Sequence, residues 1–91
     1  SMTLHPDDTR RKMLLHRARY RGFKEADLLI GGFAAAALPA MSEDELYAFE
    51  AILSLNDHDI YAWVTGASDP PANIDHGLIA KMRAFDAAIR P

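Results

Sequence analysis

The sequence has no cysteine among its 91 residues. This absence excludes disulfide bonds, zinc sites built on thiolates and a cysteine nucleophile. Long apolar runs are also missing. The longest candidate, residues 28–41, is broken by Pro39 and falls short of the roughly 20 apolar residues that a membrane span needs. The chain begins with polar residues, so the sequence predicts no signal peptide, no membrane contact and a cytoplasmic location.

Motifs that carry enzyme chemistry are equally scarce. The sequence contains no P-loop, no dinucleotide fingerprint and no serine–histidine–aspartate order. The segment Asp57-His58-Asp59 could resemble an acid/base cluster, but it stands at a predicted helix start, where capping is the simpler interpretation. No histidine lies three or four residues from another, so we expect solvent-facing histidines, no metal site and no catalytic residue. The four histidines are His5, His16, His58 and His76.

Positive charge is concentrated at one end of the chain. Residues 1–24 hold seven cations and two anions, for a net charge of +5, while residues 25–91 hold three cations and eleven anions, for a net charge of −8. A basic first helix could bind nucleic acid. However, the sequence pI of about 5.7 is well below the pI above about 9 that is typical of dedicated nucleic-acid domains. A protein partner with an acidic patch explains the asymmetry at least as well.

Helical periodicity runs through most of the chain and no strand alternation is present. Residues 1–91 are long enough for one domain, in which we interpret Ser1 as a cloning remnant and residues 1–8 as a flexible N-terminal segment. We therefore expect a single all-α domain, a compact bundle of about five short helices. The expected helices run from residues 7–9 to about Tyr20, from Lys24 to Ala37, from the Ser42 capping box with Glu45 to about Ser54, from Asn56 or Asp57 to Gly66, and from about Ile74 to Ile89.

Apolar stripes along these helices predict the core. The Gly31-Gly32 pair interrupts one of them at a cost of about 1 kcal/mol per glycine, which either a bend or a close helix–helix approach would explain. The predicted buried positions are Met13, Leu14, Leu15, Ala18, Ala26, Leu29, Ile30, Phe33, Ala34, Ala37, Leu46, Phe49, Ile52, Leu53, Ile60, Trp63, Val64, Leu78, Met82, Phe85 and Ile89.

The stretch from Tyr20 to Glu25 joins the first two helices. Gly22 occupies the position of a helix C′ residue, where it can adopt a positive φ or allow another group to come close. Arg21 and Glu25 are four residues apart and could pair. The simplest interpretation is a helix corner with a surface ion pair worth about 0–1 kcal/mol. Tyr20 and Phe23 flank the glycine and are candidates for a partner surface.

A family resemblance adds to this interpretation. The segment Arg21-Gly22-Phe23-Lys24-Glu25 matches the R-G-x-x-E motif of the succinate dehydrogenase flavinylation factors, the bacterial SdhE/YgfY-like family with a mitochondrial counterpart. Asp27, the cap at residues 41–45 and the segment from Asp57 to Trp63 follow in the order typical of that family, so that the resemblance covers residues from about 10 to 89. Two departures lie outside the motif, namely Met41 where leucine is common and the small residues of segment 31–37.

The resemblance implies a bacterial assembly factor and not an enzyme. Members bind the flavoprotein subunit of succinate dehydrogenase or fumarate reductase and promote covalent attachment of FAD, through a bond between a histidine of the flavoprotein and the flavin 8α carbon. The FAD belongs to the partner, so no stably bound cofactor is expected, and a monomer is expected. The residues implied in partner binding are Arg17, Tyr20, Arg21, Gly22, Phe23, Glu25 and Asp27, with Asp57 and Asp59 as secondary candidates.

The expected roles within the motif differ. Arg21 would bridge carboxylates or carbonyls at the interface through its planar guanidinium. Gly22 would allow close backbone approach, and Glu25 would either orient Arg21 or meet a cation of the partner. The alternative from another class is a nucleic-acid-binding or regulatory module that uses the basic first helix, and it predicts binding that depends steeply on salt. A small antitoxin-like interaction protein is a third option, but no specific motif supports it.

Overall fold

A computed structural model describes residues 6–91. Within that range the regular structure consists of five α-helices and one short 3-10 turn, without a strand. The helices are α1 (Pro6–Arg19), α2 (Lys24–Ala37), α3 (Glu43–Leu53), α4 (Asp57–Thr65) and α5 (His76–Ile89), and the turn η1 (Leu38–Ala40) follows α2. The expected all-α bundle of about five short helices is confirmed.

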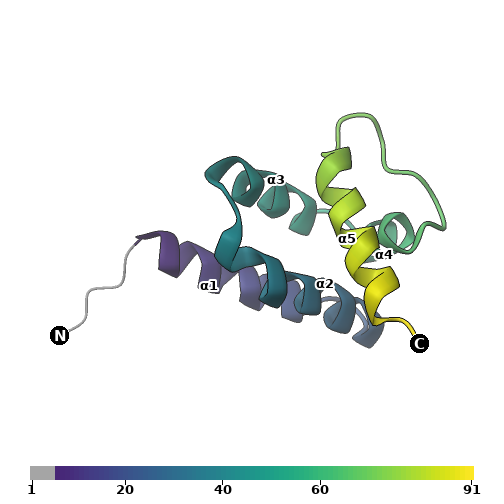
Figure 1. Cartoon of the computed structure of the whole chain (residues 1–91), viewed down its shortest axis with the longest axis horizontal. Coiled ribbons are helices and arrows are strands. Elements are labelled where there is room, and N and C mark those ends of the chain that lie inside the picture. The colour runs from purple at the N-terminus through teal and green to yellow at the C-terminus, as the bar shows by residue number, and fades with distance from the viewer. Residues whose placement is uncertain (1–5) are drawn as a thin grey trace.

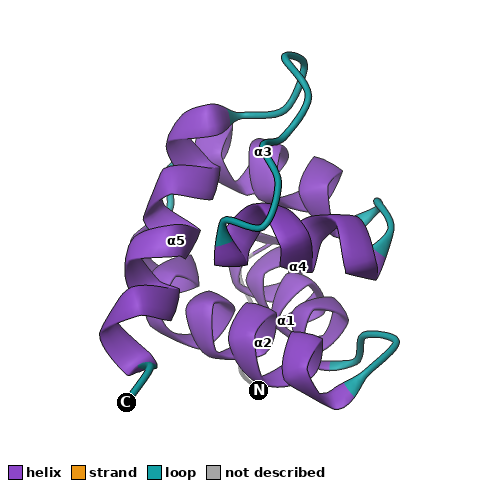
Figure 2. Cartoon of the chain, turned by 90° about the vertical axis from the view of Figure 1, so that its right-hand side faces the viewer, coloured by secondary structure: helices purple, strands orange, loops and turns teal. Residues whose placement is uncertain are grey.

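The helices form two layers. α1 and α2 run antiparallel along one side of the molecule, and α3, α4 and α5 lie over them (Figure 1). Seen end-on, α5 stands at one edge of the second layer, while α3 and α4 lie beside it (Figure 2). Because nothing covers the α1–α2 pair on its other side in the described part of the chain, that side faces solvent.

Caps place the helix boundaries. Ser42 and Glu45 form the predicted capping box, with both of its hydrogen bonds at 3.2 Å. The Asn56 side chain caps α4, and Gly66 ends that helix with φ of +83°, a conformation that glycine adopts without strain. α5 begins two residues later than expected, because the Asp75 carboxylate accepts the Leu78 N–H at 2.9 Å and so acts as its N-cap.

The predicted stripes of α2, α3 and α4 pack into one core between the layers. Two predicted core residues are wrong. Met13 is 62% exposed, because α1 contacts the core through Leu14 and, one turn later, through Ala18. Met13 precedes Leu14 and is therefore turned about 100° away from it around the helix axis. Ile89 is exposed because the last buried residue of α5 is Asp86, and the helix extends past the core beyond it.

The two central glycines of α2 permit close contacts on two sides, and this settles the choice that the sequence left open. A Cβ at Gly31 would lie 3.0 Å from Cγ and 3.2 Å from Cα of Arg19, so Gly31 lets α1 and α2 approach each other. A Cβ at Gly32 would lie 3.2 Å from Cζ of Phe85, so Gly32 makes room for α5. The helix continues through both positions.

The start of the chain is only partly described. Helix α1 begins at Pro6, so residues 6–8 of the expected N-terminal segment belong to it. Residues 1–5, including Ser1 and His5, lie outside the described residues. From residue 6 onward, no helix has both the length and the apolar character to cross a membrane.

Candidate functional site

The corner between α1 and α2, residues 20–23, is fastened to the second layer by Arg21. Only 8% of the Arg21 side chain is exposed. Its Nε and Nη2 atoms each lie 2.7 Å from Oδ1 of Asp57, at the start of α4. A guanidinium presents five N–H donors in a fixed plane, so one side chain can serve several acceptors at once.

The remaining donors of Arg21 bind main-chain carbonyls. Nη2 donates to the carbonyl of Leu53 at 2.9 Å, and the Leu55 carbonyl lies at 3.5 Å. Nη1 donates to the carbonyl of Arg17 at 3.2 Å, in the last turn of α1. Arg21 therefore ties the ends of α1 and α3 and the start of α4 together.

This arrangement corrects the expected role of Arg21. The side chain points into the protein, where its donors are used by the chain's own acceptors. It pairs with Asp57 and not with Glu25, so Glu25 does not orient it. The sequence could not reveal this, because the two partners are 36 residues apart and are brought together only by the fold.

Two carboxylates fix the backbone of the corner. Oδ2 of Asp57 accepts the Gly22 N–H at 2.6 Å, while its Oδ1 holds Arg21. The Asp27 carboxylate accepts the N–H of Arg21. Gly22 does not use a positive φ, so its importance lies in the close approach of Asp57. Asp57, which sequence reasoning ranked as secondary, is the central acceptor of the corner.

Phe23 anchors the other side of the corner. Its half-buried ring stacks on His58 with 4.6 Å between centroids and meets Tyr61 edge-on at 5.3 Å. Such ring pairs contribute about 0.5–1.5 kcal/mol beyond the area they bury. Phe23 is thus largely a packing residue, although one edge of the stack, at His58, is exposed.

The groups that face outward at the corner are Glu25, Lys24 and Tyr20. Glu25 is exposed in the first turn of α2 and makes no hydrogen bond or ion pair with any described residue. Tyr20 is 70% exposed and packs against the His16 ring at 4.5 Å. Of the other candidates, Asp59 is exposed, and Arg17 lies 3.8 Å from Glu50 across to α3.

One outward residue was missed by sequence reasoning. Leu28 is 64% exposed, three residues after Glu25 on α2, and shares a surface hollow with Tyr20. The signal was available, because Leu28 falls outside the apolar stripe that defines the buried face of its helix. Tyrosine is enriched at protein interfaces, so the exposed Tyr20, with Leu28 beside it, is suited to protein recognition.

Metal-ligand clusters and shifted pKa values are the remaining features that could mark a reactive centre among the described residues. No group of three or more potential metal ligands gathers within residues 6–91. The shifted titrations belong to surface ion pairs. Hydrogen bonding from Lys81 lowers the pKa of the Glu45 carboxyl, and the same contact raises the pKa of Lys81. Hydrogen bonding to Asp86 likewise raises the pKa of Arg90.

Comparison with known proteins places this geometry in context. Residues 12–86 match the family described as flavinator of succinate dehydrogenase. The chain is similar to proteins named succinate dehydrogenase assembly factor 2, mitochondrial. In Saccharomyces cerevisiae the identity is 44% over 63 residues, covering 69% of this chain and 39% of the relative, and in Candida glabrata it is 47% over 58 residues, covering 64% and 38%. In Komagataella phaffii the identity is 33% over 85 residues, covering 89% of this chain and 45% of the relative.

These relatives contradict the expected location and bear on the expected bacterial origin. The expected cytoplasmic location is wrong, because the matched relatives are named as mitochondrial and point to the mitochondrion. They are fungal proteins, so the expected bacterial origin has no support from them. The chain spans less than half the length of each of these relatives.

Proposed function

The chain belongs to the family described as flavinator of succinate dehydrogenase, and from this premise we propose that it is an assembly factor. It binds the flavoprotein subunit of succinate dehydrogenase, or of the related fumarate reductase, and promotes covalent attachment of FAD to that subunit. It is not itself an enzyme in this role. It acts as a monomer, and the FAD stays with the partner.

The observation that carries this proposal is Glu25, which has no partner among residues 6–91 and stands beside a rigid corner. Arg21 and Asp57 fix the backbone on one side of Gly22, and the first turn of α2 holds Glu25 on the other. A carboxylate without an internal partner is available for a cation or an N–H donor of another protein. Because the corner is already fixed, little ordering entropy is lost when it docks.

The corner contributes orientation to the reaction. A factor that holds the flavoprotein with its histidine beside the flavin converts a rarely sampled geometry into a frequent one, and this alignment is worth several kcal/mol in favourable cases. Glu25, Tyr20 and Leu28 supply the outward contacts, whereas Arg21 and Asp57 keep them in place. The chemistry of bond formation belongs to the flavin and to the partner.

The test is assisted flavinylation of the purified flavoprotein subunit, read as covalent flavin fluorescence in a denaturing gel. We expect Glu25→Gln to reduce the rate by about tenfold or more, which corresponds to about 1.4 kcal/mol of lost contact. Asp44→Asn, which removes an exposed carboxylate on α3, is the matched control and leaves the rate unchanged. If the wild-type chain neither binds the subunit nor accelerates flavinylation, the proposal fails.

The alternative of nucleic-acid binding loses part of its support, because three of the seven cations in residues 1–24 are paired with carboxylates. Arg10 and Arg17 of α1 pair with the α3 carboxylates Glu43 and Glu50, and Arg21 pairs with Asp57. Side chains committed to internal carboxylates release few counterions from a phosphate backbone. Tight binding of RNA or DNA with a steep salt dependence would support the alternative instead.

A further inference from the structure

The outer side of the α1–α2 pair carries a groove that extends away from the corner. A hollow of about 380 Å³ lies beside Tyr20 and Leu28. A second hollow of about 510 Å³ lies farther along the same seam, beside Leu15, Leu38 and Pro39. Both are lined by Ala35, so they adjoin along the seam between the two helices, and we call the two hollows together the α1–α2 groove.

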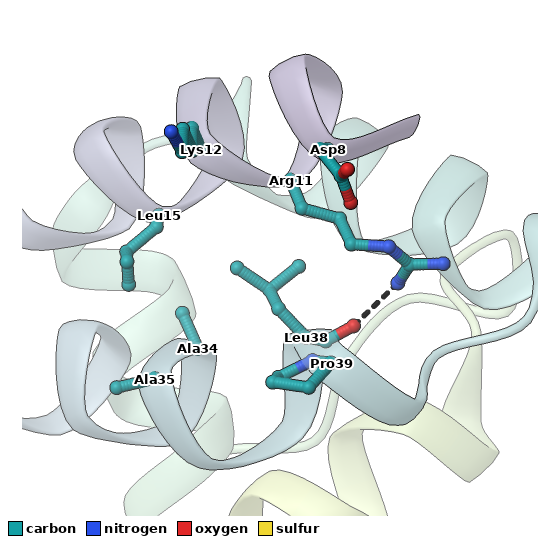
Figure 3. A pocket seen from close by; sticks show the side chains of 8 residues that line it. All are labelled: Asp8, Arg11, Lys12, Leu15, Ala34, Ala35, Leu38 and Pro39. Atoms are coloured by element: carbon teal, nitrogen blue, oxygen red, sulfur yellow. Dashed lines mark hydrogen bonds between the residues drawn. The ribbon is translucent and has the colours of Figure 1, made fainter. Parts of the chain in front are cut away.

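The side of the groove that α2 forms is lined mostly by small apolar residues. Leu15 from α1 and Ala34 and Leu38 from the other side reach toward the same space, and Ala35 lies at its edge (Figure 3). From residue 28 to residue 41 the chain has no charged side chain. Alanine and glycine along a helix face let another backbone approach closely, and packed helices lie about 8–10 Å apart. A helix laid along the groove would therefore meet an apolar surface at short range.

The positive charges along the edge of the groove come from α1, and two of them have no hydrogen-bond or ionic partner among the described residues. Lys12 and Arg19 are exposed, and neither makes a hydrogen bond or ion pair with the residues described. They are seven residues apart, which is two helical turns or about 10 Å along the axis. Elsewhere on α1, Arg10 and Arg17 have carboxylate partners.

The other charged residues that line the groove are Arg11, Asp8 and Asp27. The Arg11 guanidinium donates to the main-chain carbonyls of Leu38 and Met41, with 3.1 Å to the second, and it forms no ion pair with a carboxylate of residues 6–91 (Figure 3). Asp27 is engaged by the N–H of Arg21, and Asp8 lies at the far end of the groove. The middle of the groove is thus apolar on one side and cationic on the other.

We propose that the α1–α2 groove receives an amphipathic helix of the flavoprotein partner. The apolar face of that helix packs on Leu15, Ala35 and Pro39, and two of its carboxylates, about two turns apart, meet Lys12 and Arg19. The groove begins at Tyr20 and Leu28, so one partner can cover it together with the corner. This inference rests on the proposed function and adds the chemistry of the docked segment to it.

A steric plug tests the groove. Ala35→Trp fills the point where the two hollows meet, and Ala51→Trp, at an exposed alanine of α3, is the matched control. Both variants are compared with the wild type for binding of the purified flavoprotein subunit by calorimetry, with circular dichroism as the check on the fold. We expect Ala35→Trp to raise Kd by about tenfold or more, which is about 1.4 kcal/mol, while the control stays close to wild type.

A photo-crosslinking amino acid at position 35 identifies the occupant. The expected product joins position 35 to a helical segment of the flavoprotein that has an apolar face and two acids about two turns apart. A crosslinked segment without such acids overturns the inference, as does equal binding by Ala35→Trp and the control. In those cases the proposed function stands if the wild type still promotes flavinylation. Absence of any binding by the wild type overturns both.

Discussion

Gly22 and Asp57 are packed so closely that the glycine has no room for a side chain. A Cβ at position 22 would lie 2.8 Å from Oδ2 of Asp57, the oxygen that accepts the Gly22 N–H. The carboxylate cannot turn away without loosening its hold on Arg21. The glycine of the corner is therefore required for space, although its φ is not positive.

Replacing this glycine is the first prediction. We expect Gly22→Ala to lower the free energy of unfolding by about 1–3 kcal/mol, because it displaces a charge-assisted hydrogen bond. Urea denaturation followed by circular dichroism measures the loss. Gly77→Ala is the control, since a Cβ there would lie at an ordinary 3.4 Å from Asp75. The control should be neutral or stabilising by up to about 1 kcal/mol. Equal stability of both variants would contradict the close-packing argument.

The second prediction concerns the Arg21–Asp57 pair. Asp57→Ala leaves a guanidinium that is largely enclosed without its carboxylate, and we expect a loss of about 3 kcal/mol of stability. Arg21→Lys keeps the charge but loses the planar fork that also reaches the carbonyls of Leu53 and Arg17. A double-mutant cycle with Asp57→Ala and Arg21→Lys should give a coupling energy of about 1–3 kcal/mol. Strictly additive effects would show that the two residues act independently.

The third prediction separates the two glycines of α2. At Gly31 a Cβ would press on main-chain and side-chain atoms of Arg19, and the two helices would have to move apart. We expect Gly31→Ala to destabilise the protein by about 1–2 kcal/mol, despite the better helix propensity of alanine. At Gly32 the neighbour is the half-buried Phe85 ring, which can shift, so Gly32→Ala should cost less. Thermal unfolding of both variants decides, and the reverse order would contradict the packing described here.

The fourth prediction is a pH dependence at the start of α3. The Lys81 ammonium, 2.8 Å from Glu45, and then the Ser42 N–H lower the pKa of this carboxyl below its ordinary value of 4.5. A carboxyl with a lowered pKa in the folded state stabilises the protein above pH 4.5, and this stabilisation is lost as the pH falls through the lowered pKa. Glu45→Gln should therefore be less stable than wild type at pH 7, and the difference should shrink toward pH 3.

The comparison for that experiment is Asp44→Asn, which removes the neighbouring carboxylate without breaking a hydrogen bond or ion pair among the described residues. Urea titrations of wild type and both variants at a series of pH values give the difference directly. A gap between wild type and Glu45→Gln that is constant from pH 7 to pH 3 would show that the contact with Lys81 contributes nothing.

Much of the fold follows from local signals in the sequence. The Ser42 capping box, the glycine at position 66 and the apolar stripes of α2 to α4 act within a few residues, so they fix helix ends and buried faces without knowledge of the fold. The failures at Met13 and Ile89 arise in α1 and α5, where the width of the buried stripe depends on which elements pack against the helix, and the sequence does not give that arrangement.

The candidate site was less predictable for a different reason. The sequence suggested Tyr20 and Phe23 as a partner surface, and Tyr20 is exposed whereas Phe23 packs on His58 and Tyr61. It left open whether Glu25 orients Arg21 or faces outward. It could not show that Arg21 faces inward, because the acceptors of its side chain include Asp57 and the carbonyls of Leu53 and Leu55. A long-range pair of this kind has no local pattern, and only the packed structure reveals it.

Because Arg21 is anchored inside the protein, the chain becomes able to present its corner to a partner only at a late stage of folding. The α1–α2 hairpin supplies Asp27 and the Arg17 carbonyl as acceptors for the corner, yet Asp57 and the Leu53 carbonyl, which complete its anchoring, come more than thirty residues later. A nascent or partly unfolded chain, or an excised hairpin peptide, would carry the whole motif in its sequence and still present it in no defined shape. A partner that recognises the corner would therefore bind only those copies of the chain in which α3 and α4 have already packed against α1 and α2.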